Sequence, residues 1–151
     1  MSALGRDGGE PLSSNGAATI RFEAAIPQFT VHDVVRTAEY HRDVLGFEIV
    51  GYWATPPVFA IVRRDQVEVF FNRTDQPSVG RGRAQGAYDA YLHVVGVEAL
   101  AAERRPRGAD VVEGRIVRIY GQLELVIRDC TGLVLAFGEH TSRPERRLIE
   151  D

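Results

Sequence analysis

Lysine is absent from this chain, and cysteine occurs only once. All 18 basic residues of the 151-residue sequence are arginines, which excludes a lysine nucleophile, a lysine Schiff base and the lysine of a phosphate-binding loop. The single Cys130 excludes an internal disulfide and a cysteine zinc cluster. No apolar run approaches the roughly 20 residues that a membrane-spanning helix needs, so no membrane partner is expected.

Secretion signals and nucleic-acid-binding patterns are also missing. Residues 1–21 contain no basic segment followed by an apolar one, so we identify no secretory signal and expect a cytoplasmic protein. The formal net charge is −3, and the arginines are dispersed apart from small clusters at 104–107 and 143–147. A net acidic chain without a basic face binds nucleic acid poorly, so no nucleic-acid partner is expected.

The residues that are present suit one globular domain. With 44% hydrophobic and 26% charged residues, a chain of this length can bury a core without a metal or a disulfide. Residues 1–21 are rich in Gly, Ser, Ala and Asn and are interpreted as a flexible arm, and the charged residues 141–151 as a tail. The domain is predicted to cover residues 22–140.

Within this domain, residues 22–76 and 87–140 repeat one order of elements around a glycine-rich linker. Each repeat has a strand, a helix and three further strands. The helices are predicted from Val34, behind the N-cap Asp33, to about Val44, and from Val97 to Arg105. The strands are predicted near 22–31, 47–53, 58–63, 66–72, 87–95, 110–113, 122–128 and 133–138. The fold class is therefore α+β, with two tandem βαβββ units in one pseudo-symmetric domain.

Three strings in this pattern resemble the vicinal oxygen chelate superfamily, the group of glyoxalase I, bleomycin-resistance proteins, fosfomycin-resistance enzymes and extradiol dioxygenases. They are AIPQFTVHD at 25–33, AEYHRDVLGF at 38–47 and YGQLELVIRDCTG at 120–132. The third is similar to the family's closing hairpin, with Cys-Thr in place of Pro-Asp. The resemblance implies two paired modules whose sheets curl around a cavity, with helices outside, and it is closest in kind to bleomycin-resistance proteins.

The same resemblance implies where enzymes of the superfamily would hold a divalent metal. The four strand positions correspond here to Ile26, Glu68, Asp89 and Ala136. Two of them are hydrocarbon and none is histidine, whereas a catalytic iron, zinc or nickel site needs about three protein ligands with histidine among them. We therefore expect no metal and no other cofactor, and the strand register at Glu68 is left open.

The four histidines and the cysteine are predicted to have different environments. His41 lies on the first helix and is interpreted as a solvated surface residue, His32 as a turn residue, and His140 as incidental at a fraying strand end. His93 is either a partly buried hydrogen-bonded residue or a group that contacts a ligand or moves a proton. Cys130 is interpreted as an exposed thiol in a turn.

Alternation along the strands predicts which side chains would line the implied cavity. The selected ligand-binding residues are Gln28, Thr30, Trp53, Glu68, Phe70, Asp89, Tyr91, His93, Tyr120 and Glu124. No inward arginine is assigned beside these carboxylates, which favours a cationic or polar aromatic ligand. The alternative is that Arg118 or Arg128 pairs with some of them.

These observations favour a metal-free protein that sequesters a polar or cationic aromatic small molecule, as in bleomycin resistance, over an enzyme. The resemblance implies a homodimer with the ligand in a cleft between subunits and an N-terminal arm crossing to the partner. The alternatives are a metal-dependent lyase, isomerase or dioxygenase of the same superfamily, and a protein–protein module or inert binder. The sequence names neither the ligand nor a catalytic residue.

Overall fold

The structure is a computed structural model that describes residues 18–77, 87–144 and 146–147. Most of the predicted arm, the glycine-rich linker and the end of the predicted tail lie outside the described residues. None of the described helices has the length and apolar character needed to cross a membrane. The domain limits deduced from the sequence stay a prediction.

The N-terminal half is a four-stranded sheet with one helix. Its elements are β1 (Gln28–Val31), α1 (Val34–Asp43), β2 (Glu48–Trp53), β3 (Phe59–Arg64) and β4 (Val67–Arg73). The strand order is β1-β4-β3-β2, with β1 parallel to β4 and the other neighbours antiparallel. The helix α1 begins where the sequence predicts, because the Asp33 carboxylate accepts a hydrogen bond from the Arg36 amide at 3.0 Å.

The C-terminal half repeats this plan. Its elements are β5 (Ala90–His93), α3 (Val97–Arg104), a 3-10 turn (Arg105–Arg107), β6 (Asp110–Val117), β7 (Gln122–Arg128) and β8 (Val134–His140). The order β5-β8-β7-β6 matches the first sheet, and the short β9 (Arg146–Arg147) lies beside β6. The α+β class with two tandem βαβββ units is therefore confirmed, whereas the curling of the sheets around one cavity stays a prediction.

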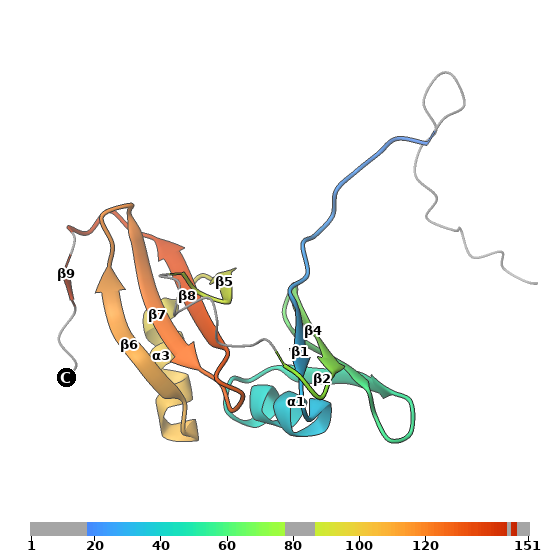
Figure 1. Cartoon of the computed structure of the whole chain (residues 1–151). Coiled ribbons are helices and arrows are strands. Elements are labelled where there is room, and N and C mark those ends of the chain that lie inside the picture. The colour runs from blue at the N-terminus through green and yellow to red at the C-terminus, as the bar shows by residue number, and fades with distance from the viewer. Residues whose placement is uncertain (1–17, 78–86, 145, 148–151) are drawn as a thin grey trace, which may run out of the picture.

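One hydrophobic core joins the two halves. Figure 1 shows the halves side by side, with a helix packed against each sheet. Val31 and Phe71 of the first half belong to the same buried cluster as Leu92 and Phe137 of the second. Because the two sheets share this core, the halves form one packed unit rather than two separate domains.

Two side chains that were predicted to be exposed are buried or half-buried. His41 is fully buried, and its Nε2 lies 3.0 Å from Oδ2 of Asp129 in the β7–β8 turn. Its ring meets Phe47 and Phe71 edge-on, at centroid distances of 5.6 and 4.9 Å. The solvated-surface interpretation of His41 was wrong because His41 lies on the buried face of α1 together with Val34 and Ala38. Cys130 is half-buried, and burial raises the pKa of its thiol.

Three strands differ clearly in length from the prediction, and one of them, β5, covers only Ala90–His93 of the predicted residues 87–95. The strand β1 begins at Gln28 rather than near residue 22, because Pro27 has no amide hydrogen to donate to a strand ladder. The preceding residues are exposed, including 95% of Phe22 and 85% of Ile20. The strand β6 continues to Val117 rather than ending near 113, through two irregularities in its register with β7.

Candidate functional site

An aromatic row lies on the face of the N-terminal sheet that points away from α1. In β3, Ala60 and Val62 are buried against the core, so Phe59 lies on the opposite face. Trp53 and Phe70 flank it at ring-centroid distances of 5.4 and 5.3 Å, both in edge-on geometry. We call these three residues the aromatic row. Trp53 is 47% exposed, so the row offers an aromatic surface whose geometry is fixed by its own ring contacts.

Gln28 and Thr30 lie beside this row, as the alternation of β1 predicts. Val31 of the same strand is fully buried, whereas Gln28 is exposed and Thr30 is half-buried. The parallel register places Gln28 opposite Phe70. Phe59 was not selected from the sequence, although its register opposite Trp53 marks it as a member of the same face.

A tyrosine–carboxylate cluster lies on the C-terminal sheet, and we define it as Tyr88, Tyr91, Arg118, Tyr120 and Glu124. The Glu124 side chain is fully buried. Its carboxylate accepts hydrogen bonds from Arg118 Nε at 3.0 Å and from the Tyr91 hydroxyl at 3.0 Å. It also accepts from the Tyr120 hydroxyl at 2.5 Å and, more weakly, from that of Tyr88 at 3.4 Å. A buried carboxylate is stable only with such partners.

The cluster keeps its phenols neutral and its charges balanced. Burial, followed by the hydrogen bond to Glu124, raises the pKa of Tyr120 to about 12. The same causes raise the pKa of Tyr91. Both hydroxyls therefore remain hydrogen-bond donors near neutral pH. Arg118 also donates to Glu113 at 2.6 Å, so the sequence-based assumption that no arginine faces these carboxylates was wrong, and the Arg118 alternative holds for Glu124.

Tyr91 can reach Glu124 because residue 138 is glycine. The register of the parallel β5–β8 pair places Tyr91 opposite Ala136 and beside Gly138. A Cβ atom at Gly138 would lie 1.8 Å from the Tyr91 hydroxyl oxygen, far inside van der Waals contact. No sequence motif marks Gly138, and only the pairing of the two strands reveals its role.

A polar hollow of about 810 Å³ lies where the two halves meet. It is lined by Glu23, Ala24, Ala25, Ile26, Pro27, Arg63, Asp65, Gln66, Val67, Glu68, Tyr91, Leu92 and His93. It therefore brings together Glu68, Tyr91 and His93, three of the residues selected from the sequence. The Glu68 carboxylate lies 3.7 Å from the Arg63 guanidinium, which also donates to Glu48 at 2.8 Å. His93 is exposed at the wall of the hollow.

Asp89 does not line this hollow. It precedes β5, and its Oδ2 accepts a hydrogen bond from the Val134 amide at 2.8 Å. Its carboxylate therefore helps to hold the beginning of β8 against β5. The structure thus places Asp89 in a bond that fixes the sheet, while its selection as a ligand-binding residue stays a prediction.

The positions that the family resemblance assigns to a metal do not fit one. Ile26 and Ala136 offer hydrocarbon, and the strand register places Tyr91 rather than Asp89 opposite Ala136. Glu68 faces Arg63 instead of a second ligand. Among the described residues, no group of three His, Cys, Asp or Glu side chains could hold a metal ion. We therefore derive no chemical step through a metal.

Comparisons with known proteins place this fold among small-molecule-binding and enzyme structures. No family model and no curated protein sequence matches the chain. A bleomycin-binding protein from bleomycin-producing Streptomyces verticillus, solved with copper(II)-bleomycin, is 21% identical over 83% of this chain and 100% of its own, with a TM-score of 0.60. A glyoxalase-related enzyme from Clostridium phytofermentans is 15% identical over 80% and 97%, with a TM-score of 0.65.

TioX from Micromonospora sp. ML1 is similar to the same extent, at 19% identity over 79% of this chain and 99% of its own, with a TM-score of 0.64. Identities this low establish a common fold and leave function open. The chain therefore has the fold of the bleomycin-binding and glyoxalase-related structures. The resemblance noted in the sequence is therefore confirmed at the level of the fold.

Proposed function

We propose that this chain binds a polar aromatic small molecule and sequesters it, without a metal and without making or breaking bonds. The observation that carries the proposal is the pair of preorganised aromatic surfaces on the sheet faces opposite the helices. The aromatic row is fixed by edge-on ring contacts. The exposed rings of Tyr91 and Tyr120 are fixed by hydrogen bonds to the buried Glu124. Rings held in place lose little entropy when a flat ligand stacks on them.

The chemistry of the cluster favours binding over catalysis. Glu124 is engaged by several donors, and the phenols of Tyr91 and Tyr120 hold their protons because their pKa values are raised. A general base needs a free lone pair toward the substrate and a pKa near the working pH. The Glu124 carboxylate lacks the first because its oxygens accept from Arg118 and the tyrosines, and the phenols of Tyr91 and Tyr120 lack the second. The common fold with bleomycin-binding proteins, one of them solved with copper(II)-bleomycin, also supports sequestration.

A preference for a cationic ligand depends mainly on Glu68. Arg118 balances Glu124, and Asp89 is occupied by a backbone amide. Glu68 is 30% exposed at its side chain and lies 3.7 Å from an arginine that already holds Glu48. Its carboxylate is therefore the one in the proposed site that is most available to a cation.

The test uses a charged probe and its neutral counterpart. We expect N-methylacridinium to quench the fluorescence of Trp53, the single tryptophan of the chain, and to raise the melting temperature by mass action. Glu68→Gln should weaken N-methylacridinium binding about tenfold, which corresponds to about 1.4 kcal/mol. The same variant should leave the binding of neutral acridine unchanged, and Glu39→Gln on the exposed face of α1 serves as the control.

Two results would contradict the proposal. If neither acridine quenches Trp53, the aromatic surfaces are not a binding site. If the purified protein carries one tightly held iron, zinc or nickel ion per chain, a metal-dependent enzyme replaces sequestration. Equal affinity for the two probes, unaltered by Glu68→Gln, would remove only the cationic preference.

We further propose that the chain acts as a homodimer. The exposed Phe22 and Ile20 and the exposed aromatic row offer apolar surface to a second copy. We expect a dimer by light scattering at micromolar concentration, with an interface of roughly 1,200 Å² or more in total. Deleting residues 1–19 should weaken the dimer if the arm crosses to the partner. A monomer would disprove the assembly, and an unchanged dimer after the deletion would disprove only the crossing arm.

A further inference from the structure

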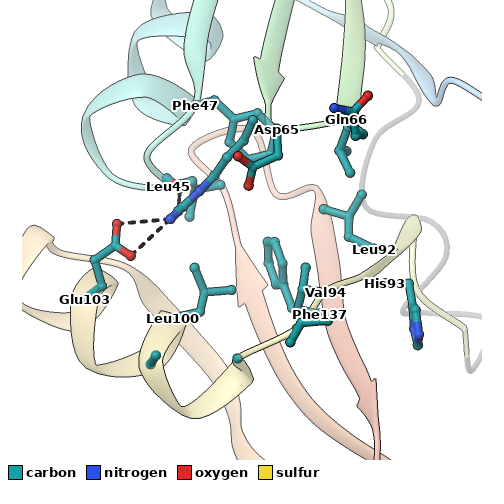
Figure 2. Close-up of a pocket in the computed structure, with 15 residues that line it drawn as sticks. Leu45, Phe47, Asp65, Gln66, Leu92, His93, Val94, Leu100, Glu103 and Phe137 are labelled. Atoms are coloured by element: carbon teal, nitrogen blue, oxygen red, sulfur yellow. Dashed lines mark hydrogen bonds and ion pairs between the residues drawn. The ribbon is translucent and has the colours of Figure 1, made fainter.

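A second, apolar hollow lies at the junction of the two halves, and Figure 2 shows its lining. Its volume is about 400 Å³, within the range of small-molecule sites. The side chains that give it its apolar character come from both halves and are Leu45, Phe47, Leu92, Val94, Leu100 and Phe137. We call it the apolar pocket. No residue of the aromatic row or of the tyrosine–carboxylate cluster lines the apolar pocket.

The charged groups at the Glu103 end of the apolar pocket are paired within the chain. The Arg64 guanidinium donates to both oxygens of Glu103, at 3.2 and 3.0 Å, and to the Leu45 carbonyl at 2.9 Å. Figure 2 shows Glu103 at one end of the pocket, with dashed lines that mark its two hydrogen bonds. At the beginning of α3, the amides of Gly96 and Val97 donate to Glu139. This end of the pocket therefore offers apolar contact and no preference for a charge.

The apolar pocket adjoins the polar hollow. Five residues line both of them, namely Asp65, Gln66, Val67, Leu92 and His93. In Figure 2, Gln66, Leu92 and His93 lie on the side of the pocket away from Glu103. The two spaces therefore meet between the β3–β4 turn and β5.

The charge of the polar hollow is negative. Glu23, Asp65 and Glu68 line it, and Arg63 is the one arginine among its described lining residues. Glu23 accepts from Arg21 at 2.5 Å, so the carboxylates of Asp65 and Glu68 give the hollow its charge. The Arg63 guanidinium donates to Glu48, outside the hollow, at 2.8 Å and stands 3.7 Å from Glu68. A positive group that enters the hollow therefore meets more carboxylates than guanidinium groups.

We propose that the apolar pocket and the polar hollow form one amphipathic groove, which binds an elongated molecule with an aliphatic tail and an amine head. The tail lies among the apolar side chains of both halves, and the ammonium group lies near Glu68. The inference rests on the proposed function only in that Glu68, Tyr91 and His93 belong to both sites.

Calorimetric titration of the full chain with n-hexylamine, n-octylamine, octan-1-ol and octanoate tests the groove near neutral pH. We expect affinity to rise about fourfold for each methylene added to the amine, the equivalent of about 0.8 kcal/mol per buried methylene. Octylamine should bind at least tenfold more tightly than octanol, and octanoate most weakly. Equal affinity of hexylamine and octylamine, or of octylamine and octanoate, would overturn the proposal.

Two alanines of α3 provide a matched pair of variants. Ala99 lines the apolar pocket and Ala102 does not, and both are exposed, so neither substitution threatens the core. Ala99→Trp should weaken octylamine binding at least tenfold by filling the pocket, whereas Ala102→Trp should leave it unchanged. Equal effects of the two variants would show that the tail lies elsewhere and would overturn the proposal.

The head group and the independence of the two sites are tested separately. Glu68→Gln should weaken octylamine about tenfold and octanol little, and an equal loss for both would overturn the assignment of the head. Trp53→Ala should leave octylamine binding intact while it abolishes acridine binding. Octylamine binding in a protein that binds neither acridine would retain the groove and reject the proposed function, and the reverse pattern would reject the groove.

Discussion

Replacing His41 by alanine is expected to lower the free energy of unfolding by about 3 kcal/mol or more. The fully buried ring packs against Phe47 and Phe71, so its removal leaves a cavity in the shared core. It also removes the partner of Asp129 Oδ2 at 3.0 Å. The other oxygen of Asp129 keeps its hydrogen bonds to the amides of Thr131 and Leu133. The substitution therefore leaves only the Oδ2 side of this buried carboxylate without a hydrogen-bond partner.

Urea denaturation measures the change, and the exposed His32 is the control. His32→Ala should alter stability by less than about 0.5 kcal/mol. The double variant with Asp129→Asn should show a coupling energy, because the two residues are in direct contact. A loss below about 1 kcal/mol for His41→Ala, or additive effects in the double variant, would mean that the contact between α1 and the β7–β8 turn does not hold the halves together.

His41 also illustrates what the sequence could not predict. Local signals were sufficient for the elements: the Asp33 cap and Gly46, with φ of +78°, bound the first helix region. Helical spacing from Val34 and Ala38 also places His41 on the buried face of α1, so its burial could be deduced from local signals. What the sequence could not predict is the polar partner of His41, because Asp129 lies 88 residues further along the chain.

The same contrast between local signals and long-range contacts applies to the residues of the candidate site. Alternation was enough to assign Phe70 to the sheet face opposite α1, because Val69 and Phe71 on either side of it are buried. Arg118 was predicted only as an alternative partner, because it follows β6, where the register with β7 shifts twice, and such irregularities make simple alternation fail. Gly138 was missed because its role depends on the neighbouring strand that carries Tyr91.

Replacing Glu124 by alanine is expected to cost about 3–5 kcal/mol of stability and to abolish aromatic binding on the C-terminal sheet. The substitution leaves the Arg118 charge with one carboxylate fewer and removes the common acceptor of Tyr91 and Tyr120. Breaking one partner of a buried ion pair usually has this magnitude. Denaturation and acridine titration measure the two effects, and Glu98→Ala, on an exposed ion pair, should change stability by less than about 1 kcal/mol.

Glu124→Gln separates the charge from the packing. In the parent protein the pKa of Tyr120 is raised to about 12, while the pKa of a tyrosine in the unfolded chain is about 10. The folded state therefore retains a proton that the unfolded state has lost, so this contribution to stability is complete below about pH 10 and is lost as the pH rises toward about 12. Removing the Glu124 charge should bring the pKa of Tyr120 closer to the ordinary value and flatten that loss. The ultraviolet absorbance of phenolate follows this titration directly.

Gly138→Ala tests the tyrosine–carboxylate cluster in a second way. The added Cβ would displace the Tyr91 hydroxyl from Glu124 and leave Arg118 in place. We expect it to weaken aromatic binding while the Tyr120 titration stays near that of the parent. If Glu124→Ala costs less than about 1 kcal/mol and Glu124→Gln leaves the alkaline titration unchanged, the carboxylate does not organise the tyrosines, and the C-terminal surface cannot be the rigid wall on which sequestration depends.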